Sequence, residues 1–287
     1  MTRSSMRSFW GCSTKKGIKA VIATSGWDVL ELVQKYQPAA ITLDLHLGGD
    51  TDGWLVLQQL KNDIGVRHIP VCVMTVDEDE VLLLQKGAYD YFRKPVTNEE
   101  LENALDRLNR FADHATANLL VAVQDEQERK HIAELLDNPD LTLTAVETGR
   151  KALNQLNSKT FDAIVLDSSL ADMNLIRFLR EMYKNARNKR IPVLVQMNRK
   201  LTPEEETEWD ELAKMAVLKE VKSDAQLIDE STLALHRKAE NLPPLSRDKL
   251  VKLYQSDEMI EYKKRCLSWM MISATSLRLP PFWSVIR

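Results

Sequence analysis

The sequence has few cysteines, and their positions do not suggest a disulfide framework or a zinc site. Cys12, Cys72 and Cys266 are odd in number and far apart, whereas both kinds of site need paired or closely grouped thiols. We therefore expect structural thiols in a reducing compartment. The five histidines show no i, i+4 spacing, so the sequence does not predict a metal site made of histidines on one helix.

Long apolar runs and strong net charge are also absent. No stretch is long and apolar enough to span a membrane, and no basic segment followed by an apolar one opens the chain. The net charge of −3 gives no general attraction for nucleic acid or for an anionic membrane. Glycine-rich nucleotide loops and helix-turn-helix patterns are missing as well. We therefore expect a cytoplasmic protein with no nucleic-acid or membrane partner and no ATP site.

What is present is a regular alternation of short apolar runs and helix-period segments. The alternation starts near Ile18, pauses in a polar hinge at residues 112–118, and starts again at Leu119. A length of 287 residues favours about two domains of roughly 150 residues each. Strands that alternate with helices of this length predict a parallel, doubly wound α/β sheet. We therefore predict two such sheets in series.

The pattern gives approximate bounds for each element. In the first half we predict strands at 20–23, 41–45, 71–74 and 91–92, and helices at 27–36, 54–62, 78–86 and 98–111. In the second half we predict strands at 119–123, 141–146, 164–166, 193–195 and 216–218, and helices at 126–136, 149–156, 175–185, 203–214 and 224–239.

Polar side chains follow the ends of several predicted strands. Asp44 and Asp167 each end an apolar strand, Thr75 ends the next strand of the first half, and Lys94 and Lys219 follow the last strand of each half. The carboxyl ends of parallel strands form the edge at which open α/β sheets bind their ligands. We therefore expect one kind of site in both halves.

In these residues the chain resembles the receiver domains of response regulators and of multi-receiver hybrid sensor histidine kinases, over roughly residues 15 to 240. The resemblance implies a flavodoxin-like fold and a role in phosphorelay signalling. In that family an aspartate after the third strand accepts a phosphoryl group from a histidine kinase, while Mg²⁺, a hydroxyl residue and a lysine contact the phosphoryl oxygens. Such groups neutralise the charge that spreads over the oxygens during transfer.

The resemblance assigns a role to each strand-end residue of the first half. Asp44 is the predicted phosphorylation site, Thr75 and Lys94 are the predicted phosphate contacts, and Tyr91 is the aromatic residue that follows the switch hydroxyl. Asp44 and the backbone carbonyl of His46 are the predicted Mg²⁺ ligands. The peptide bond between Lys94 and the following proline is expected to be cis.

The first half departs from the family pattern in two places. A loop at residues 48–53 replaces the usual proline, and no acidic pair precedes the first helix. Residues 1–16 stand where the family has its first strand and helix. We therefore expect weak Mg²⁺ binding, slow phosphorylation, and a first domain that is less stable than the second.

The second half keeps less of the family pattern. Asp167 is a weak candidate acceptor and Lys219 a candidate phosphate contact, but Met197 replaces the hydroxyl residue. The acidic pair would fall on residues 123–124, and Asp125, one step beyond, is a weak candidate metal ligand. We therefore expect a pseudo-receiver with a structural or docking role.

These features predict three regions. An N-terminally incomplete receiver domain spans 15–111, a degenerate receiver domain spans 118–240, and a linker with a disordered tail spans 241–287. Residues 1–14 and 266–287 show no periodicity. A shift of reading frame at Trp-Met-Met-Ile, residues 269–272, yields three aspartates whatever the codons, which resembles the start of a further receiver. We expect the chain to be a fragment of a hybrid kinase bounded by frameshifts.

Three functions remain open at this stage. The leading hypothesis is a non-enzymatic receiver that accepts a phosphoryl group on Asp44 from a histidine kinase or a phosphotransfer protein. The first alternative is an unphosphorylated interaction module that acts only as a docking surface. The second is a non-functional fragment of a hybrid histidine kinase that lacks the catalytic core.

Overall fold

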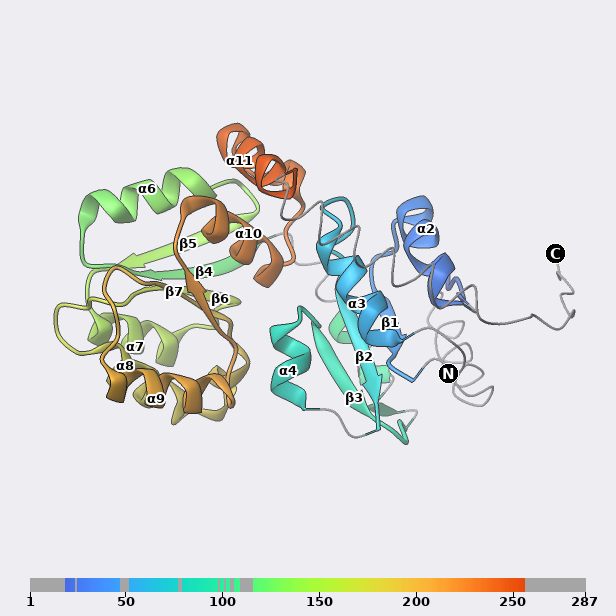
Figure 1. Ribbon diagram of the computed structural model, residues 1–287, viewed down its shortest axis with the longest axis horizontal. Coiled ribbons are helices and arrows are strands. Elements are labelled where there is room, and N and C mark those ends of the chain that lie inside the picture. The colour runs from blue at the N-terminus through green and yellow to red at the C-terminus, as the bar shows by residue number, and fades with distance from the viewer. Residues whose placement is uncertain are drawn as a thin grey trace, which may run out of the picture.

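The computed structural model describes residues 19–23, 25–46, 52–76, 79–97, 99–100, 102–103, 106–108 and 116–255. These residues form two parallel sheets, one of three strands and one of five, which lie in separate units (Figure 1). We call residues 19–108 the first unit and residues 116–255 the second unit. Within the described ranges, no helix combines the length and apolar character that a membrane span needs.

The elements agree closely with the predicted pattern in most places. The strands are β1 (Ile41–Asp44), β2 (Val71–Thr75), β3 (Asp90–Arg93), β4 (Ala117–Ala122), β5 (Leu141–Val146), β6 (Ala163–Asp167), β7 (Val193–Gln196) and β8 (Leu218–Val221). The α-helices are α2 (Gly26–Tyr36), α3 (Gly53–Asn62), α4 (Glu80–Gln85), α6 (Glu126–Leu136), α7 (Gly149–Ser158), α8 (Leu175–Tyr183), α9 (Pro203–Ala213), α10 (Asp224–Ala234) and α11 (Pro244–Tyr254). Two 3₁₀ helices are η1 (Ala186–Arg190) and η2 (Ala239–Asn241).

Most helices begin at a side chain that satisfies a free backbone N–H group. In the second unit this oxygen comes from Asp125, Thr148, Asn174, Thr202 and Ser223, each at the N-cap of its helix. The first N–H groups of a helix have no partner within the helix, so such residues fix where it starts. This local chemistry explains why the helix starts are predictable from the sequence.

The second unit has the strand order β5-β4-β6-β7-β8, with every neighbouring pair parallel. Counted within the unit, this is the order 2-1-3-4-5 of flavodoxin-like doubly wound sheets. The predicted fold class is therefore confirmed.

Alternate residues of the central strands pack into two separate hydrophobic cores. On β4, Leu120 packs with α7, α8 and α9, whereas Leu119 and Val121 pack with α6, α10 and α11. All three side chains have 0% exposure. Figure 1 shows these helix groups on opposite sides of the sheet. Burial on both faces explains the near-continuous apolar runs of these strands.

The first unit repeats this arrangement around the order β1-β2-β3. Leu57 of α3 and Leu83 of α4 pack on one face, and Cys72, Met74 and Leu108 pack together on the other. Burial raises the pKa of the Cys72 thiol to about 12. The thiol therefore stays protonated and behaves as a small apolar side chain.

The strand predicted at 20–23 is not present. Residues 19–23 form no helix or strand, and Val21 and Ile22 are 59% and 46% exposed. In a sheet with the order 2-1-3-4-5, the second strand pairs only with the first strand. No described residue of the first unit forms that first strand, so residues 19–23 have no strand to pair with. The predicted segment at 1–14 lies outside the described residues, as does part of the predicted helix at 98–111.

The start of the predicted C-terminal linker is also wrong. Residues 244–254 form α11, which packs on the second unit through Leu250 and Tyr254, 0% and 6% exposed. The Ser246 hydroxyl donates to the carbonyl of Leu135 at 2.7 Å. The rest of the predicted tail, including residues 266–287, lies outside the described residues.

Candidate functional site

The carboxylate of Asp44 lies at the carboxyl end of β1 and is held from two sides. Asp44 is 2% exposed. Its Oδ2 atom accepts a hydrogen bond from Lys94 Nζ at 2.5 Å, and Oδ1 accepts one from the backbone N–H of His46 at 3.0 Å. The structure therefore brings together Asp44 and Lys94, two of the residues predicted from the strand ends, with the backbone of His46.

A glycine allows the helix after Asp44 to start close to it. The N–H of Gly53 donates to the carbonyl of Leu45 at 3.1 Å. A Cβ atom on Gly53 would lie 2.6 Å from the carbonyl oxygen of Asp44 and 2.5 Å from the Cα of Leu45. Any larger residue would therefore displace the end of β1, which carries the carboxylate. This requirement was not part of the sequence prediction.

The other two strand ends place a hydroxyl and an ammonium group at the same edge. Thr75 ends β2, and the backbone N–H of Lys94 donates to its carbonyl at 2.7 Å. The Lys94–Pro95 peptide bond is cis, as predicted. The Thr75 hydroxyl is buried and has no hydrogen-bond partner among the described residues. A buried unpaired hydroxyl at a ligand-binding edge points to a group that the chain alone does not provide.

The surroundings of Asp44 favour its charged form. Burial by itself disfavours the carboxylate, but the hydrogen bonds from Lys94 and His46 and the charge of Lys94 outweigh it, so the pKa of Asp44 is lowered. A charged carboxylate is a nucleophile, and the adjacent ammonium group stabilises negative charge next to it. This arrangement suits the transfer of an anionic group to Asp44.

Tyr91 lies on β3 beside this site and contacts the second unit. Its hydroxyl accepts a hydrogen bond from Arg190 Nη2 at 3.1 Å, and the guanidinium carbon lies 5.2 Å from the ring centre. Arg190 belongs to η1 and also pairs with Asp90 at 3.3 Å. No sequence signal predicts this contact, because the two residues are 99 positions apart.

Asp167 occupies the matching position of the second unit but has different partners. It is 6% exposed, and its Oδ1 atom accepts from the N–H of Ser169 at 2.8 Å and from Asn198 Nδ2 at 3.1 Å. Burial raises the pKa of Asp167, and nearby Glu128 adds to the shift. The carboxylate is therefore held by neutral donors and not by an ammonium group. Asn198 was not among the predicted site residues.

Lys219 does not lie where the sequence pattern placed it, which was after the end of the last strand. The prediction ended the last strand at 218, but β8 runs from Leu218 to Val221, so Lys219 lies inside the strand, level with Leu194. Its Nζ atom faces Glu230 at 3.8 Å. Strand register instead places Ser223 at the level that Lys94 has in the first unit.

The strand register also supports the prediction that Met197 stands in place of the hydroxyl residue. Asp44 pairs with Met74 and Asp167 with Gln196, so Met197 stands at the level of Thr75. A methionine has no hydroxyl group to donate to an anion. The second unit therefore has a carboxylate at this edge without the hydroxyl and ammonium groups of the first.

Asp125 serves as a helix cap in the structure. Its Oδ1 atom accepts from the N–H of Glu128 at 2.8 Å at the start of α6. In the described part of the chain, no cluster of three or more histidine, cysteine, aspartate or glutamate residues is arranged to hold a metal ion. The geometry therefore gives Asp125 a capping role, and its role as a metal ligand stays a prediction.

Comparisons with known proteins agree with this arrangement. The family model of the response regulator receiver domain matches residues 2–106. The polar-differentiation response regulator DivK of Brucella ovis is 30% identical over 95 residues, which cover 32% of this chain and 76% of DivK. The C4-dicarboxylate response regulator DctR of Bacillus subtilis, described as probable, is 27% identical over 155 residues, covering 53% of this chain and 64% of DctR.

Other relatives match over a smaller part of their length. The probable transcriptional regulator ycf27 of Porphyra purpurea is 31% identical over 103 residues, or 36% of this chain, and the chain spans 42% of its length. A solved structure of the chemotaxis protein CheY4 of Vibrio cholerae has 21% identity and a TM-score of 0.37, covering 42% of this chain and 100% of CheY4. On the sequence matches, and with its strand-end residues arranged as described, the chain belongs to the response regulator receiver domain family.

Proposed function

We propose that the first unit is a phosphorelay receiver that accepts a phosphoryl group on Asp44 from a histidine kinase or a phosphotransfer protein in the cytoplasm. On this proposal the chain is a signalling module and not an enzyme. The second unit is a pseudo-receiver with a docking role. The alternative is an interaction module in which neither aspartate is phosphorylated.

One observation carries the proposal. At one sheet edge the Asp44 carboxylate is buried and paired with Lys94, and the buried Thr75 hydroxyl lacks a partner among the described residues. A phosphoryl group on Asp44 would supply acceptor oxygens for that hydroxyl. Its charge would remain next to the ammonium group of Lys94.

The proposed step is a direct transfer between nucleophiles. A carboxylate oxygen of Asp44 attacks the phosphorus of a phosphohistidine, a phosphorus–oxygen bond forms, and the phosphorus–nitrogen bond breaks. The electron pair of that bond leaves with the imidazole of the donor. Lys94 stabilises the charge on the phosphoryl oxygens as it is redistributed. The product on Asp44 is an acyl phosphate.

The donor set at this edge is compatible with Mg²⁺. Asp44 and the carbonyl of His46 are oxygen ligands of the kind that Mg²⁺ prefers, and this ion usually keeps several water molecules. When bound, it would neutralise charge on the phosphoryl oxygens. With two protein ligands proposed, we expect weak binding and slow phosphorylation.

The second unit lacks two of the groups proposed to contact phosphate in the first unit. This supports a role in which the second unit is not phosphorylated. Asp167 accepts from neutral donors, Met197 stands at the hydroxyl level, and Lys219 faces Glu230. A phosphoryl group on Asp167 would therefore meet neither a hydroxyl nor an ammonium group. We propose that Asp167 does not accept phosphate.

The proposal is tested by incubating the full chain with acetyl phosphate and Mg²⁺ and measuring intact mass. We expect one added phosphoryl group that is stable in acid, labile in base, and located on Asp44 by peptide mapping. Asp44→Asn should abolish the addition, and the matched variant Asp167→Asn should retain it. Label on Asp167, or no label on either residue, would contradict the proposal.

A further inference from the structure

A cavity of about 920 Å³ lies between the two units, and both units line it. Each of the eight described strands contributes a lining residue within two positions of its start, such as Pro70 before β2, Tyr89 before β3 and Asp162 before β6. The cavity therefore lies at the amino ends of the strands in both sheets. Asp44 and Asp167 end their strands at the opposite edge, so the cavity is separate from both of these sites.

Contacts between the units border the cavity. Gln85 of α4 donates through Nε2 to the carbonyls of Ala213 at 2.6 Å and Ala216 at 3.1 Å. His236, which follows α10, packs edge-on against the Tyr89 ring, with the ring centres 5.4 Å apart. Small ligands commonly bind between domains, in cavities of about 300–1,000 Å³. The size and position of this cavity are therefore those of a ligand site.

The acidic residues that line the cavity already have partners within the chain. Asp140 accepts from Arg237 through both carboxylate oxygens, at 2.5 and 3.1 Å. Asp162 accepts from a backbone N–H group at 2.7 Å, and Glu230 faces Lys219 at 3.8 Å. These three carboxylates therefore do not need a cation from outside.

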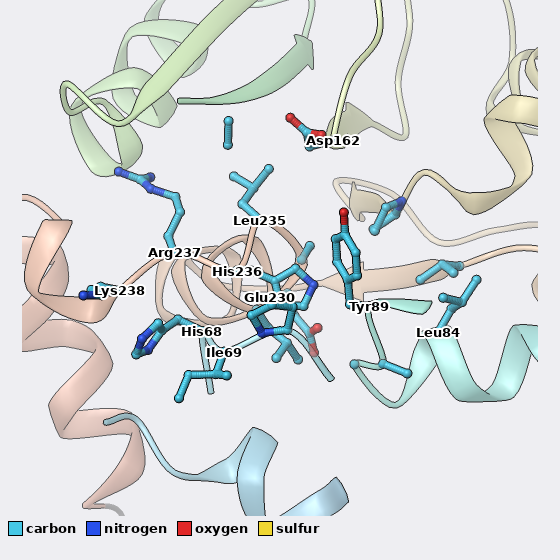
Figure 2. A pocket seen from close by; sticks show the side chains of 18 of the residues that line it. His68, Ile69, Leu84, Tyr89, Asp162, Glu230, Leu235, His236, Arg237 and Lys238 are labelled. Carbon is cyan, nitrogen blue, oxygen red and sulfur yellow. The ribbon is translucent and has the colours of Figure 1, made fainter. Parts of the chain in front are cut away.

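A group of basic side chains from both units lies at one side of the cavity. His68 of the first unit lines it together with His236 and Lys238 of the second, and we call these three residues the basic cluster. Figure 2 shows His68 and Lys238 on one side, with His236 between them and Tyr89. Among the described residues, Lys238 has no ion-pair partner. Its charge acts on His68 more strongly than that of Glu240, which has the opposite sign.

Further positive charge surrounds the basic cluster. Burial is the main cause that lowers the pKa of His68 to about 4, and the charges of Lys238 and Lys61 add to it. Burial also holds the pKa of His236 well below its usual range. Positive groups add to this second shift, Lys61 first, followed by His68 and Arg67. An anion among these groups would relieve their mutual repulsion, because a nearby negative charge favours the protonated form of histidine.

We propose that the cavity binds a small, multiply charged anion with phosphate or carboxylate groups, and that the basic cluster holds this anion between the two units. Each unit supplies part of the cluster, so the bound anion joins the units. The imidazoles bind it in their protonated form, and binding takes up protons. The site lies away from Asp44 and needs no phosphorylation of that residue.

The test compares hydrogen exchange of the full chain in pyrophosphate, in citrate and in potassium chloride at equal ionic strength, without Mg²⁺. We expect at least one of the two anions to slow exchange several-fold in peptides covering 66–72 and 232–240. Peptides covering 41–46, at the Asp44 edge, should not change. Potassium chloride should leave all of these peptides unchanged.

Matched variants test the residues of the basic cluster. Lys238→Met should lower the affinity for the effective anion at least about tenfold, because it removes one of the charges that hold the anion. Lys200→Met, at an exposed lysine that follows the carboxyl end of β7, should keep the affinity of the unchanged chain.

Proton uptake gives an independent readout. In the effective anion, the titration midpoints of His68 and His236, followed by NMR, should rise towards the ordinary value of about 6.5. By linkage, the affinity then increases as the pH falls below about 6.5, by up to about tenfold per pH unit for each histidine. His68→Gln should bind at pH 7.5 as the unchanged chain does and lose part of the increase at pH 5.5.

The outcomes identify the ligand or overturn the proposal. Protection by pyrophosphate alone would assign the site to phosphate compounds, protection by citrate alone to carboxylates, and protection by both to multiply charged anions in general. Equal exchange in all three salts, or protection that does not include 66–72 and 232–240, would overturn the proposed site. Unchanged affinity in Lys238→Met would overturn the role of the basic cluster.

Discussion

Lys61 is buried at the end of α3, where its ammonium group holds the loop that leads to β2. Its Nζ atom donates to the carbonyls of Arg67 at 3.0 Å and Ile69 at 2.7 Å. Burial is the main cause that lowers the pKa of Lys61 from 10.5 to about 7, and the nearby charge of Arg67 adds to it. The folded chain therefore releases this proton far more readily than the unfolded chain.

This shift predicts a pH dependence of stability. Between pH 7 and 10.5 the unfolded chain binds more protons at Lys61, so the contribution of Lys61 to the free energy of unfolding rises with pH. The slope approaches about 1.4 kcal/mol per pH unit. Urea unfolding at pH 7 and pH 9 should show this rise in the unchanged chain and lose it in Lys61→Met. Lys159→Met, at an exposed lysine, should keep it; equal slopes in both variants would contradict the assignment.

At the scale of single residues, the sequence predicts well where the strand-end residues of the first unit lie and predicts poorly where Lys219 lies. Asp44, Thr75 and Lys94 follow successive strands, and parallel strands bring such ends to one edge. Lys219 was misplaced because the sequence pattern ended β8 too early, and a shift of a few residues along a strand changes a side chain's level in the sheet. Arg190 escaped prediction because its partners are far away in sequence.

Helix α11 shows how the sequence pattern fails at the scale of elements. The two prolines at 243–244 read as the end of a helix, whereas Pro244 is the first residue of a new one. The first helical position tolerates proline because an N–H group at that position would have no partner within the helix. Lys249 Nζ then ties α11 to Asp224 at the start of α10, at 2.6 Å.

The packing of α11 predicts that it stabilises the second unit. Leu250 is 0% exposed and lies in the core that α6 and α10 share. Leu250→Ala should lower the free energy of unfolding of the second unit by about 2–5 kcal/mol, because it leaves a cavity. Lys252→Ala, at an exposed position of the same helix, should change it by less than about 0.5 kcal/mol. Chemical unfolding followed in both variants measures the difference, and similar values would show that α11 is only loosely attached.

At the scale of the whole molecule, one buried arginine links the two units. Arg67 belongs to the first unit and is 1% exposed. Its Nη1 atom pairs with Asp229 of α10 and donates to the Tyr254 hydroxyl of α11 at 2.6 Å. The guanidinium carbon also lies 5.2 Å from the Tyr254 ring centre. The units therefore share an ion pair between a buried arginine and a partly exposed aspartate.

Removing this arginine should uncouple the unfolding of the units. Arg67→Ala removes the buried partner of Asp229, whose side chain is 20% exposed, so we expect the contact between the units to weaken. We expect two separate calorimetric transitions, with hydrogen exchange showing that the first unit, whose described sheet has three strands against five, unfolds first. Arg247→Ala, at an exposed arginine of α11, should unfold as the unchanged chain does. A single transition shifted as a whole would argue against separable units.

The contacts that the second unit makes with α4 and β3, through Gln85 and Arg190, have a consequence for any external protein that uses this surface. Two groups joined in one chain meet at an effective concentration that reaches the millimolar range for short connections. A free partner must therefore compete with a neighbour that is always present, and its apparent affinity is reduced by the fraction of chains in which the surface is open. A mutation that weakens the contacts of Arg190 with Tyr91 and Asp90 would then raise the affinity for such a partner without changing the residues that bind it.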